Sequence, residues 1–307
     1  MDKRPLGKRI KYSALYWLVR SLIFTANAIP RKAWLRFCGF LGRIAYVIVG
    51  DARRLTIDHL KVAYGSERTE DEIISMSKKV FRMLGRNAGE IFRAIKVKTL
   101  GDLDKILVTH GFENFERARE KGKGVMFLTC HLGAFDLQIT NMSLRGLKPN
   151  IIGTPLKDKR LNELLFDYRN AYGAVAVERG KETLRLIKAL KLAGQVAILI
   201  DQDTKVKSRF VNFFGKPAAT PVGAAILAIK TGCAVVPTYV YLDETDWKQH
   251  MYILPEIPTI ITGDDEHDMV ENTRVYNQFI EDTIRKHPTQ WVWMHERWKT
   301  KPGEEIV

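Results

Sequence analysis

The sequence predicts an α/β fold, an αβα sandwich on a mainly parallel sheet that is preceded by an N-terminal helical segment. From residue 101 onward, short apolar runs of strand length alternate with patterns of helical periodicity, as expected of parallel strands joined by helices. The 307 residues are 46% apolar and 27% charged, which suffices for a large core and excludes a disordered protein. Lys and Arg exceed Asp and Glu by 14, and the first 50 residues carry ten basic residues against one acidic residue. The basic charge therefore belongs mainly to the N-terminal segment.

This segment, residues 1–50, contains two apolar stretches, 12–30 and 33–50. The first has a single charge, at Arg20, and the second is broken by two arginines. Neither is a clean run of the roughly 18 apolar residues that a spanning helix needs. Aromatic and basic residues within apolar helices favour a segment that lies in the interface beside anionic lipid, so we expect membrane-associating helices here. The alternatives are a spanning segment and a helical hairpin that packs on the main core.

Residues 51–307 are expected to form a single α/β domain with a helical lead-in at 51–100. Thr69 followed by three acidic residues predicts a helix N-cap with an acidic first turn. Buried strands are expected at 124–130, 149–153, 175–177, 196–200, 234–242 and 250–254, and helices from about 134 and at 159–172, 181–193, 221–231 and 268–287.

The cysteines and the absent motifs exclude several classes of protein. Cys38, Cys130 and Cys233 are scattered among apolar neighbours with no CxxC pair, which favours a reduced compartment over a disulfide framework. The chain has no GxxxxGK[ST], GxGxxG or HExxH motif, and its basic residues form no recognisable nucleic-acid module. We therefore expect no nucleic-acid partner.

The strongest candidate for chemistry is the segment 130–136, Cys-His-Leu-Gly-Ala-Phe-Asp. His131 directly follows an apolar strand, at the carboxyl end where open α/β sheets place their sites. Gly133 permits a tight turn, and Asp136 then falls near the start of the next helix, from where its carboxylate can reach the imidazole. Such a hydrogen bond fixes the tautomer and leaves the other ring nitrogen as a general base. The alternative is a structural histidine at a strand end. Cys130 is a poor nucleophile candidate, because adjacent strand residues point to opposite faces.

Asp201 and Asp203 form a second candidate, again directly after an apolar strand. If this strand lies beside the strand that precedes His131, either acid can approach the histidine. Read alone, Asp-Gln-Asp also resembles the DxD motif of nucleotide-sugar glycosyltransferases, in which two acids hold a divalent cation against a diphosphate. A metal-dependent glycosyltransferase is therefore the alternative function.

A third candidate is the segment 205–217, in which basic residues precede an aromatic run. The basic residues could meet an anionic group above an apolar surface, and a solvated turn followed by an ordinary buried strand fits the composition equally well. The tail 290–302 interleaves aromatic and basic residues in a similar way. The candidate substrate-binding residues of the third segment are Lys205, Lys207, Arg209, Phe213 and Phe214.

Taken together, these segments resemble the bacterial late lipid A acyltransferases, the lauroyl/myristoyl acyltransferase family of the lysophospholipid acyltransferase superfamily. That family includes mycobacterial phosphatidylinositol mannoside acyltransferases, and the similarity covers most of the chain. Thr154 stands where many members have arginine, and Asp136 stands where the lipid A enzymes more often have glutamate; both departures bear on the acceptor. The motifs that carry the resemblance are His-x4-Asp/Glu at His131 and Asp136, Arg-x3-Gly at 169–173, a second acidic motif at 201–203, FVxFFG with AxT at 210–220, and W-x-H-x-R-[FW]-K-T at 291–300.

The resemblance implies an acyltransferase-like fold and transfer of a fatty acyl chain from an acyl thioester, on acyl carrier protein or coenzyme A, to a hydroxyl of a lipid A precursor or related glycolipid. It implies a location at the cytoplasmic face of the bacterial inner membrane, with no cofactor or metal. His131 is then the general base oriented by Asp136, and backbone N–H groups near Gly133 and Ala134 stabilise the oxyanion. The residues expected to support catalysis or to hold phosphates are Asp201, Asp203, Arg169, Lys205, Lys207 and Arg209.

A further alternative, from a different class, is a non-catalytic peripheral protein that uses its N-terminus to bind an anionic membrane. It predicts lipid binding that is unaffected by changes at either acidic motif. The sequence leaves the oligomeric state, the acyl-chain length and the choice of acceptor open.

Overall fold

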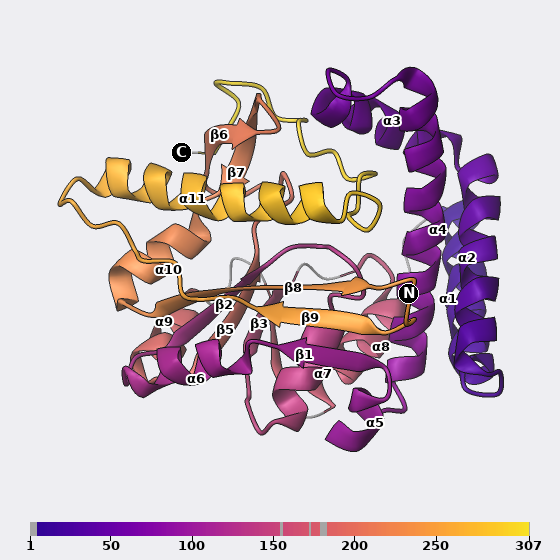
Figure 1. Cartoon of the computed structure of the whole chain (residues 1–307), viewed down its shortest axis with the longest axis horizontal. Helices are drawn as coiled ribbons and strands as arrows, with labels where there is room; N and C mark the ends of the chain where they lie inside the picture. The colour runs from indigo at the N-terminus through magenta and orange to yellow at the C-terminus, as the bar shows by residue number, and fades with distance from the viewer. Residues whose placement is uncertain (1–4, 154–155, 172, 179–182, 307) are drawn as a thin grey trace.

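The computed structural model describes residues 5–153, 156–171, 173–178 and 183–306. Figure 1 shows a sheet domain with helices on both faces and, beside it, a group of N-terminal helices that runs across the ends of the strands. Thr154 lies outside the described residues, as do the first two residues of the helix expected at 181–193.

Seven strands form one sheet in the order β1-β9-β8-β2-β5-β3-β4. Every neighbouring pair is parallel except β8 and β9, which form an antiparallel hairpin. The expected α/β fold with a mainly parallel sheet is thus confirmed, and the hairpin makes β1 and β9 run opposite to the other five strands. The strands are β1 (Leu107–His110), β2 (Val125–Thr129), β3 (Asn150–Gly153), β4 (Val175–Glu178), β5 (Gln195–Leu199), β8 (Ala234–Leu242) and β9 (Gln249–Ile253).

All six strands expected from the apolar runs are present, and β1 was not predicted because its sequence, Leu-Val-Thr-His, is not an apolar run. The central strand β2 is buried at all five positions, as is typical of a parallel strand covered on both faces. Phe127 belongs to one core cluster, and its neighbours Met126 and Leu128 belong to the other. The two clusters are therefore the two faces of the sheet.

Helices cover both faces, and a separate antiparallel hairpin, β6 (Ser208–Phe213) with β7 (Lys216–Pro221), lies beside α11. Side chains of α6 and α7 belong to the Phe127 cluster, whereas those of α9, α10 and α11 belong to the other. The helix expected from about residue 134 begins at Leu137, because the preceding residues form turns. The helices of this domain are α6 (Phe112–Glu120), α7 (Leu137–Leu144), α8 (Lys159–Asn170), α9 (Thr183–Lys191), α10 (Gly223–Thr231) and α11 (Asp265–Lys286).

The N-terminal helices pack on one another through glycine. The predicted N-cap is confirmed, since Thr69 and Glu72 form a capping box. A Cβ on Gly42 would lie 2.2 Å from the Phe81 carbonyl oxygen, and a Cβ on Gly85 equally close to the Cys38 carbonyl oxygen, so only glycine lets α2 and α4 approach this closely. These helices are α1 (Leu6–Ala26), α2 (Arg31–Ile48), α3 (Gly50–Tyr64), α4 (Glu70–Ala94) and the short α5 (Leu100–Asp104).

Helices α1 and α2 keep large apolar side chains on the surface, among them Trp17, which is 63% exposed, and Phe24, which is 81% exposed. Within the described residues, no single helix is both long and apolar enough to cross a membrane. Helices α2 and α3 meet that requirement only as a pair, and they are bent by 94° where they join. Membrane association of residues 1–50 and a domain boundary at residue 50 both remain predictions.

Candidate active site

The parallel pairing of β2 with β5 brings two of the predicted residues together. Thr129 and Leu199 are partners in register at the carboxyl ends of the two strands. His131 and Asp201 each lie two residues beyond, so they emerge side by side at the same edge of the sheet. The conditional prediction that Asp201 approaches His131 is therefore confirmed.

A single carboxylate fixes both the main chain and the ring of His131. The His131 backbone N–H donates to Asp201 Oδ2, and its Nδ1–H donates to Asp201 Oδ1, both at 2.8 Å. Trp291 Nε1–H donates a third hydrogen bond, also 2.8 Å, to Oδ2. Among the described residues, no hydrogen bond reaches His131 Nε2. The arrangement sets the tautomer that leaves Nε2 as an acceptor.

Asp201 stays ionised although it is 0% exposed. Burial raises the pKa of its carboxyl, but the imidazole of His131 and the hydrogen bonds from His131 and Trp291 outweigh that effect and lower the pKa to about 2. A buried negative charge thus lies directly behind the histidine ring, where it stabilises a proton on that ring.

Asp136 does not have the partner that we expected from the sequence. Its Oδ1 accepts a hydrogen bond from Arg169 Nε at 2.9 Å, and the ion pair also places Nη2 of Arg169 2.8 Å from this oxygen. The prediction that Asp136 hydrogen-bonds the imidazole of His131 is therefore wrong, because Asp136 binds Arg169 and Asp201 holds Nδ1 of the ring. The physical reason is the turn at 131–136, which places Asp136 at the N-cap of α7, opposite the last turn of α8 that carries Arg169.

Gly133 shapes this turn, as predicted, and its backbone N–H has a different role from the predicted one. Its φ of 65° is left-handed, and a Cβ there would lie 2.1 Å from the Val240 carbonyl oxygen. Its N–H donates to the Gln290 carbonyl oxygen at 3.0 Å, next to the bridge between Leu132 and Trp291. This N–H is therefore not available to an oxyanion, which corrects that expectation.

The C-terminal tail completes the site through Gln290 and Trp291, which were not among the site residues predicted from the sequence. The Gln290 side chain hydrogen-bonds both the N–H and the carbonyl of Leu242, which attaches the tail to β8. Farther along, Arg297 is fully buried and donates to Ala219 O and Thr220 Oγ1. Burial lowers its pKa to about 10. The only signal in the sequence was the closing aromatic motif, which showed similarity to a family without assigning a role.

Asp203 lies near the site but has a structural partner. Its two carboxylate oxygens accept hydrogen bonds from the backbone N–H and the hydroxyl of Thr300, at 2.8 and 2.9 Å. Both oxygens of Asp201 are likewise used by His131 and Trp291. These contacts favour a scaffold role for Asp203 over a paired DxD metal site.

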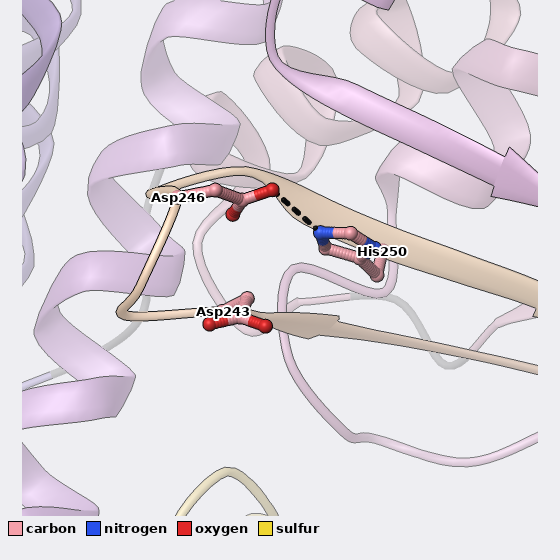
Figure 2. Close-up of side chains that lie close together, drawn as sticks. All are labelled: Asp243, Asp246 and His250. Carbon is pink, nitrogen blue, oxygen red and sulfur yellow. Dashed lines mark hydrogen bonds and ion pairs between the residues drawn. The ribbon is translucent and has the colours of Figure 1, made fainter.

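In the described part of the chain, only one group of three side chains has metal-binding geometry, and it is elsewhere. Figure 2 shows Asp243, Asp246 and His250 at the tip of the β8–β9 hairpin. His250 Nε2 is 2.9 Å from Asp246 Oδ2, and its Nδ1 is 3.0 Å from Nε2 of His110. The Asp243 carboxylate accepts from the N–H and hydroxyl of Thr245. These contacts satisfy the hairpin turn without an ion.

His131 stands at a cavity of about 360 Å³, a volume within the range of small-molecule sites. Phe127 and Thr129 alternate along β2 and therefore line the same face, and His131, two residues beyond the strand, lines the same cavity. The cavity extends from the edge that carries His131 toward the amino-terminal end of β2. Its other apolar walls are Phe135, Ile139, Met142, Ile151, Ile152, Leu156, Leu165, Ala197, Leu199 and Met251, and its polar lining includes Asp136, Gln138, Arg169, Gln202 and Thr238.

The predicted basic and aromatic binding residues lie apart from this cavity, except Arg169. Arg209 pairs with Glu266 at 2.5 Å, and Lys205 is exposed. Lys207 borders a different apolar cavity of about 270 Å³ beside α9 and α10. Phe213 and Phe214 are buried in an aromatic cluster with the tail tryptophans, so this arrangement gives no support to a substrate contact.

Cys130 has no catalytic geometry. It belongs to the core cluster on the other face of the sheet from Phe127. Burial raises the pKa of its thiol well above the ordinary value, which keeps the unreactive thiol form. These observations agree with its exclusion as a nucleophile.

Known proteins similar to the chain include several acyltransferases. A family model described as bacterial lipid A biosynthesis acyltransferase matches residues 5–300. The lipid A biosynthesis lauroyltransferase of Escherichia coli K12 is 25% identical over 305 residues, 94% of this chain and 92% of the relative. The phosphatidylinositol mannoside acyltransferase of Mycobacterium tuberculosis H37Rv is 24% identical over 221 residues, 70% of this chain and 67% of the relative. The lipid A biosynthesis palmitoleoyltransferase of E. coli K12 is 27% identical over 202 residues, 64% of this chain and 62% of the relative.

Proposed function

The chain belongs to the bacterial lipid A biosynthesis acyltransferase family and is an acyltransferase. We propose that it transfers a fatty acyl chain from an acyl thioester to a hydroxyl of a membrane glycolipid. The observation that carries the proposal is the position of His131, which lies at an apolar cavity with Nδ1 held by a buried carboxylate. A base at the mouth of an apolar cavity suits a substrate whose reacting carbonyl ends a hydrocarbon chain.

In the proposed reaction, His131 acts first as a base and then as an acid. Nε2 accepts the proton of the acceptor hydroxyl while the hydroxyl oxygen attacks the thioester carbonyl carbon. The tetrahedral intermediate collapses, the C–S bond breaks, and the proton passes from Nε2 to the departing thiolate. The products are an ester and a free thiol. Asp201 remains ionised throughout and stabilises the imidazolium between the two steps.

Arg169 is the proposed anion-binding residue of the site. Its guanidinium lines the cavity and is held there by Asp136, which is 4% exposed. A guanidinium fixed by one carboxylate retains donors for a phosphate of the donor or the acceptor. We assign Asp136 to positioning Arg169, and we keep the Ala134 N–H as the proposed donor to the oxyanion.

The acceptor is proposed to be a lipid A precursor or a related glycolipid, because the relatives are named for lipid A and for phosphatidylinositol mannoside. The donor is an acyl carrier protein or coenzyme A thioester. Exposed apolar side chains on α1 and α2 support a location on the membrane, which we propose to be the cytoplasmic face of the inner membrane.

Acyl transfer by the purified, detergent-solubilised protein tests the function directly. The assay supplies both donor types and a panel of lipid acceptors, and compares the wild type with His131→Ala in the presence and absence of chelator. We expect transfer that resists chelation and falls by about 10²–10⁴-fold in the variant. Full activity of His131→Ala would overturn the base role. Loss of acyl transfer on chelation would instead show that the reaction depends on a metal ion and would contradict the proposed metal-free mechanism.

A further inference from the structure

A pocket lined by arginines lies between α2 and α4, and it shares no residue with the cavity at His131. Arg36, Gly39 and Arg43 follow one another at helical spacing on α2, and Arg82 and Arg86 do so on α4. Together with Phe40, these side chains enclose about 170 Å³.

The positive charge of this pocket is only partly balanced. Glu244, from the β8–β9 hairpin, is 3.0 Å from Arg82 Nη2 and also pairs with Arg86. Within the described residues, Arg36 and Arg43 have no carboxylate partner. Burial lowers the pKa of Arg82, and the positive charges of Arg86 and Arg43 lower it further. The carboxylate of Glu244 acts in the opposite direction. Among the described residues, the four guanidinium groups of the pocket therefore have one paired carboxylate, which contacts two of them.

Two buried donors of the arginines that line the pocket are unsatisfied. Nε of Arg82 and Nε of Arg86 have no hydrogen-bond partner, and Arg86 is only 8% exposed. Leaving a buried charged donor unpaired is costly, so native proteins normally satisfy it. A Cβ on Gly39 would lie 3.1 Å from Arg86 Nε, so glycine here lets the Arg86 side chain pack closely against α2. The excess of guanidinium groups over carboxylates in the pocket lining indicates a ligand with several acceptor oxygens.

We propose that this pocket binds the phosphate group of an anionic membrane lipid. Guanidinium forks match the oxygens of a phosphate in bidentate fashion, and the enclosed volume admits a small tetrahedral anion. An adjoining hollow shares Arg43 and Arg82 and adds Lys78 and Lys79, which extends the positive surface.

The surroundings of the pocket point to a lipid as the source of the phosphate. Phe40 lines the pocket and is 55% exposed, and its neighbours on α2, Phe37 and Ile44, are also exposed apolar side chains. An amphipathic helix with apolar residues beside arginines is typical of a segment that lies in the headgroup region. The pocket would then bind the phosphate of a lipid while the apolar side chains of α2 enter the headgroup region of the same membrane.

Vesicle co-sedimentation tests this proposal with the full chain. The probes are vesicles of phosphatidylcholine alone and vesicles of phosphatidylcholine with phosphatidic acid. In the double variant Arg36→Lys/Arg43→Lys the net charge is unchanged but the guanidinium forks are lost. We expect its affinity for the phosphatidic acid vesicles to fall about tenfold, the effect of losing one charged hydrogen bond or more. Glycerol 3-phosphate should compete with the wild-type protein for these vesicles.

The matched control is Arg20→Lys/Arg54→Lys, which makes the same substitution at two exposed arginines of α1 and α3. It should bind as the wild type does. Equal binding by wild type and the pocket variant would overturn the proposal in favour of bulk charge. A pocket variant that binds glycerol 3-phosphate more weakly but binds vesicles normally would overturn the lipid source in favour of a free phosphate. If the pocket variant no longer binds acyl carrier protein but still binds the vesicles, the proposal is overturned and the partner of the pocket is an acidic protein.

This site can fail independently of the proposed acyl transfer. The pocket variant should retain the thermal stability of the wild type and its rate of transfer between detergent-dispersed substrates, where no bilayer is present. If the pocket variant also lost this rate of transfer, the pocket would not act in membrane binding alone. The His131→Ala variant tests the reaction independently of membrane binding.

Discussion

Asp201 accepts hydrogen bonds from both the backbone N–H and the Nδ1–H of His131, so one buried carboxylate sets the position and the tautomer of the proposed base. The two residues are 70 positions apart in the chain, and the parallel register of β2 and β5 brings them together. This relationship replaces the local pairing of His131 with Asp136 and leads to separate predictions for each acid.

The first prediction concerns Asp201→Asn. An asparagine can still accept from the His131 N–H, but its amide group would then face Nδ1, which favours the tautomer protonated at Nε2. We expect kcat to fall by about 10³–10⁴-fold while KM changes little, as happens when the carboxylate behind a catalytic histidine becomes an amide. Steady-state kinetics with the donor thioester measures both constants.

Asp203→Asn is the matched control for this change. Because the Asp203 carboxylate binds Thr300, its variant should lose stability in urea unfolding and retain most of kcat. An equal fall in kcat for the two variants would show that both acids act on the reaction.

The second prediction concerns Trp291→Phe and the pH dependence of stability. The pKa of Asp201 is about 2 in the folded protein, below its ordinary value of 3.8. Its ionised form therefore stabilises the fold fully above pH 3.8, and this contribution is lost as the pH falls through about 2. Trp291→Phe removes one donor to that carboxylate. It should cost about 1.5–3 kcal/mol near neutral pH, and the difference from wild type should shrink in acid.

Urea unfolding at a series of pH values provides the measurement, and Trp293→Phe provides the control. Trp293 Nε1–H donates to the carbonyl oxygen of Pro288, which does not titrate. Its variant should therefore lose a similar amount of stability at every pH. A pH-independent loss for Trp291→Phe as well would contradict the link to Asp201.

Much of the fold could be predicted because parallel strands buried on both faces are continuous apolar runs in the sequence. The runs around Phe127 and Ile198 identified β2 and β5, and with them the residues just beyond the carboxyl ends of both strands. The antiparallel pairing of β8 with β9 could not be predicted in the same way, because an apolar run carries no information on strand direction.

The partner of His131 was harder to predict, because proximity in the chain competes with proximity in the sheet. Asp136 is five residues away, but the left-handed turn at Gly133 places it opposite Arg169. The roles of Gln290 and Trp291 depend on how the tail returns to β8 and β5, and no local pattern encodes such a long-range contact.

The third prediction concerns Gly133→Ala. The new Cβ would lie 2.1 Å from the Val240 carbonyl oxygen at a φ of 65°. Left-handed strain and overpacking should together cost about 2–5 kcal/mol of stability and displace His131, so activity should fall as well. Gly146→Ala has comparable strain, with a φ of 82°, but nothing lies within 4 Å of its Cβ. Thermal unfolding of both variants should show the larger loss for Gly133→Ala; similar losses would mean that the close contact yields easily.

The fourth prediction separates the two possible roles of Asp136. If Asp136 positions Arg169, then Asp136→Asn and Arg169→Ala should each raise KM, and the double variant should be scarcely worse than either single variant, with a coupling energy of about 0.5–3 kcal/mol. The double-mutant cycle is measured as kcat/KM. Additive effects, with a fall in kcat for Asp136→Asn as large as that for Asp201→Asn, would return Asp136 to the role of orienting His131.

The last prediction concerns the length of the acyl chain. Ala197 lines the cavity and is the register partner of Phe127, which lies four residues before His131 on β2 and thus about 13 Å from it along the strand. Ala197→Leu should fill the far end of the cavity. Each methylene that no longer fits costs about 0.8 kcal/mol, so the ratio of kcat/KM for longer over shorter donors should fall about fourfold per methylene.

Competition between donors of different length measures this ratio, and general destabilisation cancels because both donors compete for the same enzyme. Val196→Leu, on the opposite face of β5, should leave the ratio unchanged. An unchanged ratio for Ala197→Leu would place the acyl chain outside this cavity.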